Sequence, residues 1–151
     1  MKYRRTQEMK KICQEIESDC AGSQVRRAAR FLDAYYDDYL RPSGLKRTQF
    51  TLLNELYLHP SIAIGQLAER LGVDRTTLNR NLNRLERKEL VMSKPGEDLR
   101  LRTLTLTPKG QKSLKSALPL WQTAQSEVKR HLGKHLHKLL GDLRKLENLK
   151  R

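Results

Sequence analysis

Side chains that form directional hydrogen bonds are concentrated at positions 74–87, where the sequence has helical spacing. Leu78, Leu82 and Leu85 recur at steps of three and four, so a helix would place them on one buried stripe. Its other side would carry arginine, asparagine and threonine, which can bind guanine, adenine and phosphate respectively. The expected chemistry is contact with bases and phosphates, and the predicted residues are Asp74, Arg75, Thr76, Thr77, Arg80, Asn83, Arg84 and Arg87.

A second polar cluster surrounds the glycine-containing turn at positions 96–98 and consists of Lys94, Asp98, Arg100 and Arg102. Such a turn can hold arginines against the minor groove or backbone of DNA, with Asp98 orienting Arg100 through an ion pair. In both clusters, the alternative is that the charges only keep an exposed segment solvated. The helical segment has no acidic residue from position 75 to 85 and uses asparagine and threonine, which are poor helix formers, so we favour base reading.

A helix-turn-helix is predicted to position the first cluster. Residues 64–71 form a two-turn helical pattern that Gly72 ends, and Asp74 is a good N-cap for the helix that follows. Upstream, Thr48 is expected to cap a helix that ends before His59, and residues 61–63 favour a short strand.

A hairpin is predicted to position the second cluster, because residues 90–95 and 100–106 read as two strands around a turn. Thr107 and Pro108 then begin a long helix, which Gly133 separates from a last helix. Before the central unit, residues 22–39 form an amphipathic helix, and Ile12, Cys13 and Ile16 indicate a short one.

The predicted fold class is mainly α with a small β-hairpin wing, a winged helix-turn-helix with N- and C-terminal dimerisation helices. We expect residues 1–40 to supply N-terminal dimerisation helices and residues 41–107 to form the DNA-binding region. Residues 108–151 would supply the C-terminal dimerisation helices, all within one integrated domain. The broad apolar stripes of the terminal helices favour a homodimer.

The composition favours a polyanionic partner, since 31 Lys and Arg against 17 Asp and Glu give a net charge of +14. No apolar run approaches a membrane span, and the first residues lack the apolar core of a signal peptide, so we expect a cytoplasmic protein without a membrane partner. The spacing of Cys13 and Cys20 fits no metal site, and we expect neither a metal nor a cofactor.

The chain resembles the MarR-type transcriptional regulators between about residues 20 and 132. The matching stretches are Arg26-Arg-Ala-Ala-Arg30 with Tyr36, Gly44-Leu-Lys-Arg-Thr-Gln-Phe50, Ile64-Gly-Gln-Leu-Ala-Glu-Arg-Leu-Gly72, Val73-Asp-Arg-Thr-Thr-Leu-Asn-Arg80, Asp98-Leu-Arg100 with Leu106-Thr-Pro-Lys-Gly110, and Leu118-Pro-Leu-Trp-Gln-Thr-Ala-Gln125.

The resemblance implies a homodimer that binds a pseudo-palindromic operator on double-stranded DNA. It matches Arg80 to the recognition-helix arginine of the family, and Asp98 with Arg100 to its wing motif. It also implies a repressor that a small ligand releases from DNA, although the sequence names neither the ligand nor the ligand-binding residues. Glu89 stands where the family commonly has glycine, and a left-handed backbone there costs a non-glycine residue about 1 kcal/mol.

Two other functions remain open from the residues. A redox-responsive regulator could use Cys20 or Cys13, because a helix N-terminus can lower the pKa of a thiol. A DNA-coating protein without sequence preference would suit the positive charge. An enzyme is not expected, since the sequence has no nucleophile–base pair, phosphate-binding glycine loop or suggestive carboxylate pair.

Overall fold

The structure is a computed structural model that describes residues 2–95 and 102–149. It divides into two compact units, residues 1–35 and residues 36–151. Helix α1 (Lys2–Asp19) and most of α2 (Ala21–Leu40) belong to the first unit, and the end of α2 belongs to the second. The expected division at residues 40 and 107 stays a prediction.

The first unit is two consecutive helices. Helix α1 is much longer than the short helix expected around Ile12, because its polar residues are mainly lysine, arginine, glutamate and glutamine, which favour helix without any burial. Every described side chain of α1, from Thr6 to Asp19, is exposed. Cys20 separates the two helices, and its carbonyl accepts a hydrogen bond from the backbone of Gln24 at 3.0 Å.

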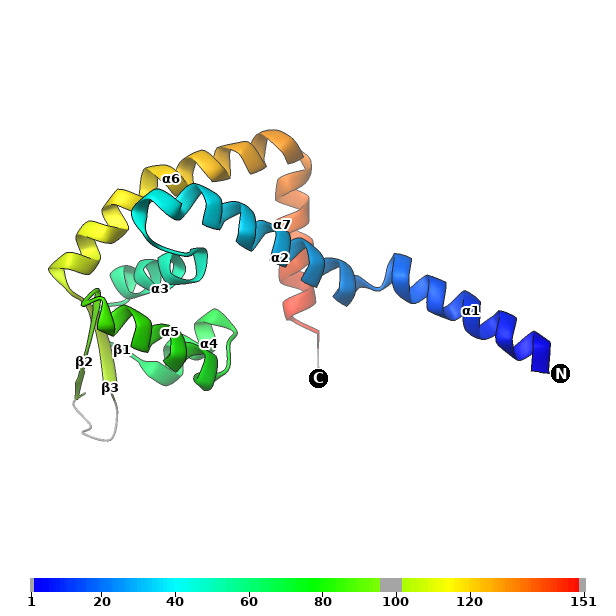
Figure 1. The fold of residues 1–151 in the computed structure, drawn as a ribbon, viewed down its shortest axis with the longest axis horizontal. Coiled ribbons are helices and arrows are strands. Elements are labelled where there is room, and N and C mark those ends of the chain that lie inside the picture. The colour runs from blue at the N-terminus through cyan, green and yellow to red at the C-terminus, as the bar shows by residue number, and fades with distance from the viewer. Residues whose placement is uncertain (1, 96–101, 150–151) are drawn as a thin grey trace. The chain divides into compact units, whose positions relative to one another are not determined.

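The second unit contains the expected order of elements (Figure 1). After α2 come the single-turn 3-10 helix η1 (Arg41–Ser43), α3 (Arg47–Leu58), β1 (Ile62–Ala63), α4 (Ile64–Leu71), α5 (Arg75–Arg87), β2 (Val91–Pro95), β3 (Arg102–Leu106), α6 (Pro108–Leu132) and α7 (His135–Glu147). This is a mainly helical winged helix-turn-helix with a small antiparallel sheet, which confirms the predicted fold class.

The sheet has three strands in the order β1-β3-β2, all antiparallel. The hairpin pairs Val91 with Leu106 and Pro95 with Arg102, and β1 adds two residues to the far edge of β3. The sequence predicted β1 from its β-prone residues, but its pairing with β3 is a non-local contact that local patterns do not encode.

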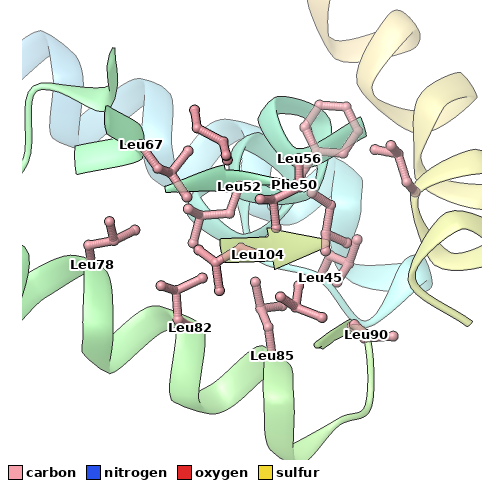
Figure 2. Packing of buried hydrophobic residues seen from close by; sticks show 14 of the residues in the cluster. Leu45, Phe50, Leu52, Leu56, Leu67, Leu78, Leu82, Leu85, Leu90 and Leu104 are labelled. Atoms are coloured by element: carbon pink, nitrogen blue, oxygen red, sulfur yellow. The ribbon is translucent and has the colours of Figure 1, made fainter. Parts of the chain in front are cut away.

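The core of this unit is formed by leucines from α3, α4, α5 and β3 (Figure 2). Leu78, Leu82 and Leu85 point from α5 toward Leu104 of β3, and all four are 3% exposed or less. The predicted leucine stripe is therefore the buried face of α5. Because three helical turns are fixed to the core this way, the direction of the opposite face is fixed as well.

Helix α3 begins at Arg47, one residue before the predicted cap, so the expectation that Thr48 is the N-cap is wrong. Lys46 is the N-cap, and its backbone N–H donates to Oε1 of Gln49 at 3.1 Å. A glutamine side chain reaching back from the third helical position satisfies one backbone donor that the helix start leaves open. Gln49 is 7% exposed, so this bond is shielded from water.

The last two helices meet at Gly133, as expected, where φ is 52°. Helix α6 continues through Pro119, and Thr123 donates a hydrogen bond to the Pro119 carbonyl at 3.0 Å. Helix α7 buries none of its residues within the chain. Among the residues described, no helix combines the length and the apolar character that a membrane crossing needs.

Candidate nucleic-acid interface

A tight turn between α4 and α5 sets where the candidate DNA-reading helix begins. Gly72 is left-handed, with φ of 61°, and the backbone N–H of Val73 donates to the Ala68 carbonyl at 3.1 Å. Glycine takes that conformation without the clash that a Cβ would cause. The chain then enters α5 at Asp74 in an extended conformation, as the N-cap prediction requires.

Asp74 caps α5 with both carboxylate oxygens. Oδ1 accepts from the Thr77 backbone N–H at 2.8 Å, and Oδ2 accepts from the Thr77 hydroxyl at 2.7 Å. Both bonds hold the pKa of Asp74 below its usual value, and the bond from the Thr77 backbone has the larger effect. With its oxygens used in this way, Asp74 positions the first turn of α5 and holds the Thr77 side chain, a role distinct from direct DNA contact.

The face of α5 opposite the leucine stripe is open to solvent. We call it the outward face and define it by its exposed residues Arg75, Thr76, Asn79, Arg80, Asn83, Arg84 and Arg87. Thr77 is half-buried beside it. The α5 residues of the predicted DNA-contacting set therefore lie together on one helix, with no carboxylate among the outward-face residues, although no contact with DNA has tested them.

Arg75 lies at the end of the outward face nearest α4. A Cβ at Gly65 would stand 3.3 Å from Nη2 of Arg75, so the guanidinium passes close over the backbone of α4. The Arg75 side chain therefore lies beside the first turn of α4. A side chain at position 65 would compete with it for space.

Arg102 connects the hairpin to α5. Its Nε donates to Oγ of Ser93 at 2.8 Å, and its Nη2 lies 3.7 Å from Oε1 of Glu86 on α5. Lys94 is exposed on β2. Asp98 and Arg100, with their predicted ion pair, lie outside the described residues.

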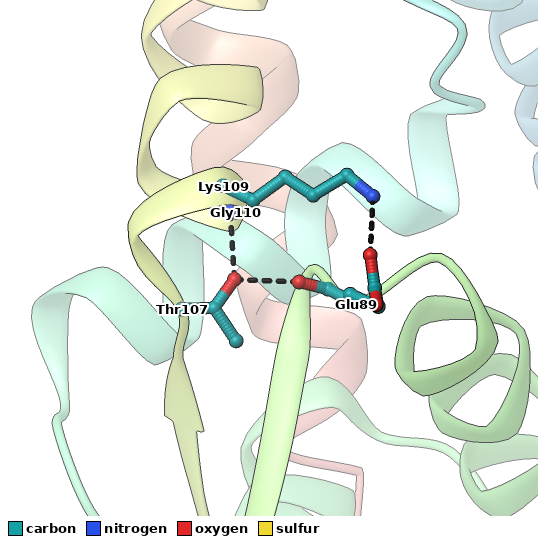
Figure 3. A network of polar contacts seen from close by, with 4 residues as sticks. All are labelled: Glu89, Thr107, Lys109 and Gly110. Carbon is teal, nitrogen blue, oxygen red and sulfur yellow. Dashed lines mark hydrogen bonds and ion pairs between the residues drawn. The ribbon is translucent and has the colours of Figure 1, made fainter.

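Behind the wing, α6 is joined to the end of α5 (Figure 3). Thr107 caps α6 by accepting from the Gly110 backbone N–H at 3.0 Å, and its hydroxyl donates to the Glu89 carbonyl at 2.6 Å. Glu89 has φ of 59°, so this departure from glycine does stand at a left-handed position. Its carboxylate accepts from Nζ of Lys109 at 2.7 Å, and this bond lowers the pKa of Glu89.

Gly110 also supports the contact between α6 and the chain that follows α5, and the sequence analysis did not assign it this role. A Cβ there would lie 2.0 Å from the carbonyl oxygen of Leu90, so only glycine allows α6 to approach this residue, which directly precedes β2, so closely. The contact joins residues 20 apart in sequence, and nothing in the local pattern distinguishes Gly110 from an ordinary helix glycine.

Two contacts of aromatic side chains help to pack α6 against α2 and α3. The Tyr36 hydroxyl donates to Oε1 of Gln125, and burial raises the pKa of Tyr36, opposed by the nearby charge of Arg47. Trp121 stacks on Phe50 with ring centroids 6.1 Å apart. Trp121 thereby packs against the hydrophobic core.

The two cysteines lie in the first unit. Cys13 is exposed and Cys20 is half-buried, so neither is a buried hydrophobic residue within the chain. Hydrogen bonds from the Ser23 side chain and backbone hold the pKa of the Cys20 thiol below its usual value. Within the residues described, no three His, Cys, Asp or Glu side chains lie close enough to hold a metal ion.

Known proteins with the same architecture are regulators of transcription. Residues 43–100 match the MarR family. YybA, an uncharacterized HTH-type transcriptional regulator of Bacillus subtilis (strain 168), is 32% identical over 90 residues, which span 59% of this chain and 60% of YybA. The alignment thus covers less than two thirds of this curated relative.

Solved structures match over more of the chain. The M. tuberculosis transcriptional regulator MosR in complex with DNA is 40% identical, with a TM-score of 0.73, over 87% of this chain and 100% of that one. A mutant of MarR from E. coli complexed with operator DNA is 25% identical, with a TM-score of 0.79, over 87% and 96%. All three relatives are regulators and none is an enzyme. The fold and the helix-turn-helix define a winged-helix protein of the regulator class, and the chain belongs to the MarR family.

Proposed function

We propose that this protein is a sequence-specific, homodimeric DNA-binding regulator that reads its operator with α5. The observation that carries the proposal is the outward face of α5, which presents arginine, asparagine and threonine without a carboxylate on a helix fixed to the core by three buried leucines. Rigid attachment matters because bidentate contacts to base edges need fixed geometry. The DNA complexes of MosR and MarR support the same partner for this chain.

Within the outward face, we assign base reading to Arg80 and Asn83, near the middle of the helix. Arg75, Arg84 and Arg87, with Thr76 and Thr77, would contact phosphates and neighbouring base edges. The wing would contribute Lys94, Asp98, Arg100 and Arg102. In that arrangement Arg102 acts partly through Glu86, since the two side chains already connect the wing to α5.

The homodimer is supported by apolar side chains that the single chain leaves exposed. In α7, Leu139, Leu140 and Leu146 are 42%, 41% and 43% exposed, and in α6 Leu118 is 39% exposed. A second copy would cover these helices through a two-fold symmetric interface. Two winged units related by that axis would favour a pseudo-palindromic operator.

We further propose, from the resemblance to the family, that the protein is a cytoplasmic repressor released from DNA by a small ligand. The test of DNA binding is a gel-shift titration on the DNA upstream of its own gene with excess random competitor. A discrete complex containing one dimer per site is expected. A smear that random DNA removes at matched salt would contradict sequence-specific reading and favour a DNA-coating protein, whose affinity ratio would be near one.

A redox response is the second candidate, and the lowered pKa of Cys20 favours it. A thiol with a lowered pKa is more ionised near neutral pH and is more readily oxidised. If Cys20 is the sensor, peroxide should weaken operator binding by the native protein and leave Cys20→Ser unaffected, with Cys13→Ser as the matched control. Equal loss in Cys20→Ser would remove the candidate.

A further inference from the structure

Helix α1 has an apolar stripe that nothing in its own unit covers. Met9, Ile12 and Ile16 are 63%, 52% and 56% exposed, and Cys13 is exposed beside them. Their spacing of three and four residues places all four on one side of the helix. Helices in proteins gain most of their stability from packing of an apolar face, so an uncovered stripe of this kind indicates a partner helix.

The charges of α1 run against its own dipole. Five of the six charged residues at positions 2–11 are basic, and all three charged residues at positions 12–19 are acidic. A helix carries partial positive charge at its N-terminus and partial negative charge at its C-terminus, which favours the opposite distribution. The first turn of α1 accordingly has no acidic residue and its last turn no basic one. Within a single helix this arrangement is destabilising.

We propose that α1 pairs in antiparallel orientation with α1 of a second copy of this chain. Antiparallel pairing places the two dipoles in opposite directions. With Met9 facing the partner's Ile16, it also sets Lys10 opposite Glu15 of the partner subunit, while Glu8 faces the partner's Glu17. It also places the apolar stripe of one helix against the same stripe of the other, because the stripe is symmetric about a midpoint between Ile12 and Cys13. Met9 then lies opposite Ile16 of the partner subunit, with the two-fold axis beside Ile12 and Cys13.

A parallel pair is disfavoured by the same features. It would align basic halves with basic halves, acidic with acidic, and the two dipoles in one direction. DNA is disfavoured as the occupant as well, because three carboxylates lie at positions 15–19 and the stripe is apolar. The pairing is independent of the proposed DNA reading, since α1 contains none of the residues assigned to it.

Cysteine cross-linking of the full chain tests the orientation. In the background C13S/C20S, three proteins are oxidised with copper phenanthroline: M9C, I16C and the double variant M9C/I16C. A disulfide within one helix is excluded, since positions 9 and 16 are about 10 Å apart along the axis. We expect a covalent dimer from the double variant and little from either single one. Efficient dimers from both single variants would show parallel pairing, and no dimer from any of the three would refute the contact.

Charge reversal in the cross-linking variant tests the complementarity. K10E and E15K, which reverse one member of the facing pair Lys10–Glu15, should each lower the yield of covalent dimer several-fold, and the combination K10E/E15K should restore it. Failure of the combination to restore the yield would overturn the charge argument. Retained binding of random DNA by each variant shows that the second unit is folded, so this result separates loss of the α1 contact from general misfolding and from failure of operator recognition.

Discussion

Replacing Gly110 with alanine isolates the close approach of α6 to the base of the wing. A Cβ at this position would lie 2.0 Å from the Leu90 carbonyl oxygen and 2.9 Å from its carbonyl carbon. A Cβ essentially never lies closer than 3.0 Å to such an atom, so α6 and Leu90 must separate by about 1 Å. Overpacking of this kind costs about 1–3 kcal/mol, and the displacement also strains the Thr107 cap, worth about 1 kcal/mol.

Helix propensity acts in the other direction, because alanine is favoured over glycine within a helix by about 1 kcal/mol. The net expectation for Gly110→Ala is a loss of about 1–3 kcal/mol in the free energy of unfolding. Gly141→Ala is the matched control: it lies in α7 with nothing within 4 Å of its Cβ, so propensity alone should leave it unchanged or stabilise it. Urea unfolding followed by far-UV circular dichroism, at one protein concentration, measures both. A Gly110→Ala protein as stable as the native one would refute the steric reasoning.

Four further predictions concern the interface and its supports. Arg80→Ala should cost about 1–3 kcal/mol at the operator and relax sequence preference, whereas equal weakening on all DNA would show that Arg80 holds only phosphate. Glu89→Gly should be more stable to urea than Glu89→Ala by about 1 kcal/mol, since both lose the Lys109 ion pair and only glycine relieves the steric strain of the left-handed backbone. Equal stabilities of the two variants would exclude backbone strain at position 89. The pKa of Asp74 is lower in the folded than in the unfolded protein, so its contribution to stability is present above the unfolded pKa, about 3.9, and is lost as the pH falls through the folded value. Asp74→Asn should keep the helix cap but flatten this loss of stability at acid pH. An unchanged dependence of stability on pH in Asp74→Asn would contradict the prediction. Removing residues 133–151 should abolish the dimer and leave poorly soluble protein in sedimentation experiments, because the apolar side chains of α6 lose their cover; a truncated protein that stays soluble and well behaved would count against the proposed dimer interface.

Elements with a local stereochemical signal could be predicted from the sequence. Gly72 ends α4 in a left-handed conformation, Asp74 caps α5, and Thr107 caps α6, because each depends on residues within four positions along the chain. The leucine stripe of α5 was equally accessible, since its period reports the buried face directly. These features determine where the outward face begins and which way it points.

Features that depend on non-local contacts or on marginal local preferences could not be predicted. Thr48 is a better isolated cap than Lys46, yet the helix begins earlier because Gln49 supplies the hydrogen bond from inside. The full length of α1 could not be predicted from apolar periodicity, because that pattern indicates buried faces and not the helix propensity of exposed residues. At the candidate site, the bond from Arg102 to Ser93 and its contact with Glu86 arise only when the wing folds against α5.

The clearance at Gly110 has a mechanical consequence for how the molecule could be switched. With no free space between α6 and Leu90, a tilt at the start of α6 cannot be absorbed there. Leu90 is bonded through its backbone N–H to the Leu85 carbonyl at 2.9 Å, within the last turn of α5. Direct contacts therefore connect the start of α6, Leu90 and the last turn of α5. In a dimer, a small rotation of α6 on each side would change the separation of the two α5 helices, and operator half-sites spaced about 34 Å apart would no longer match them.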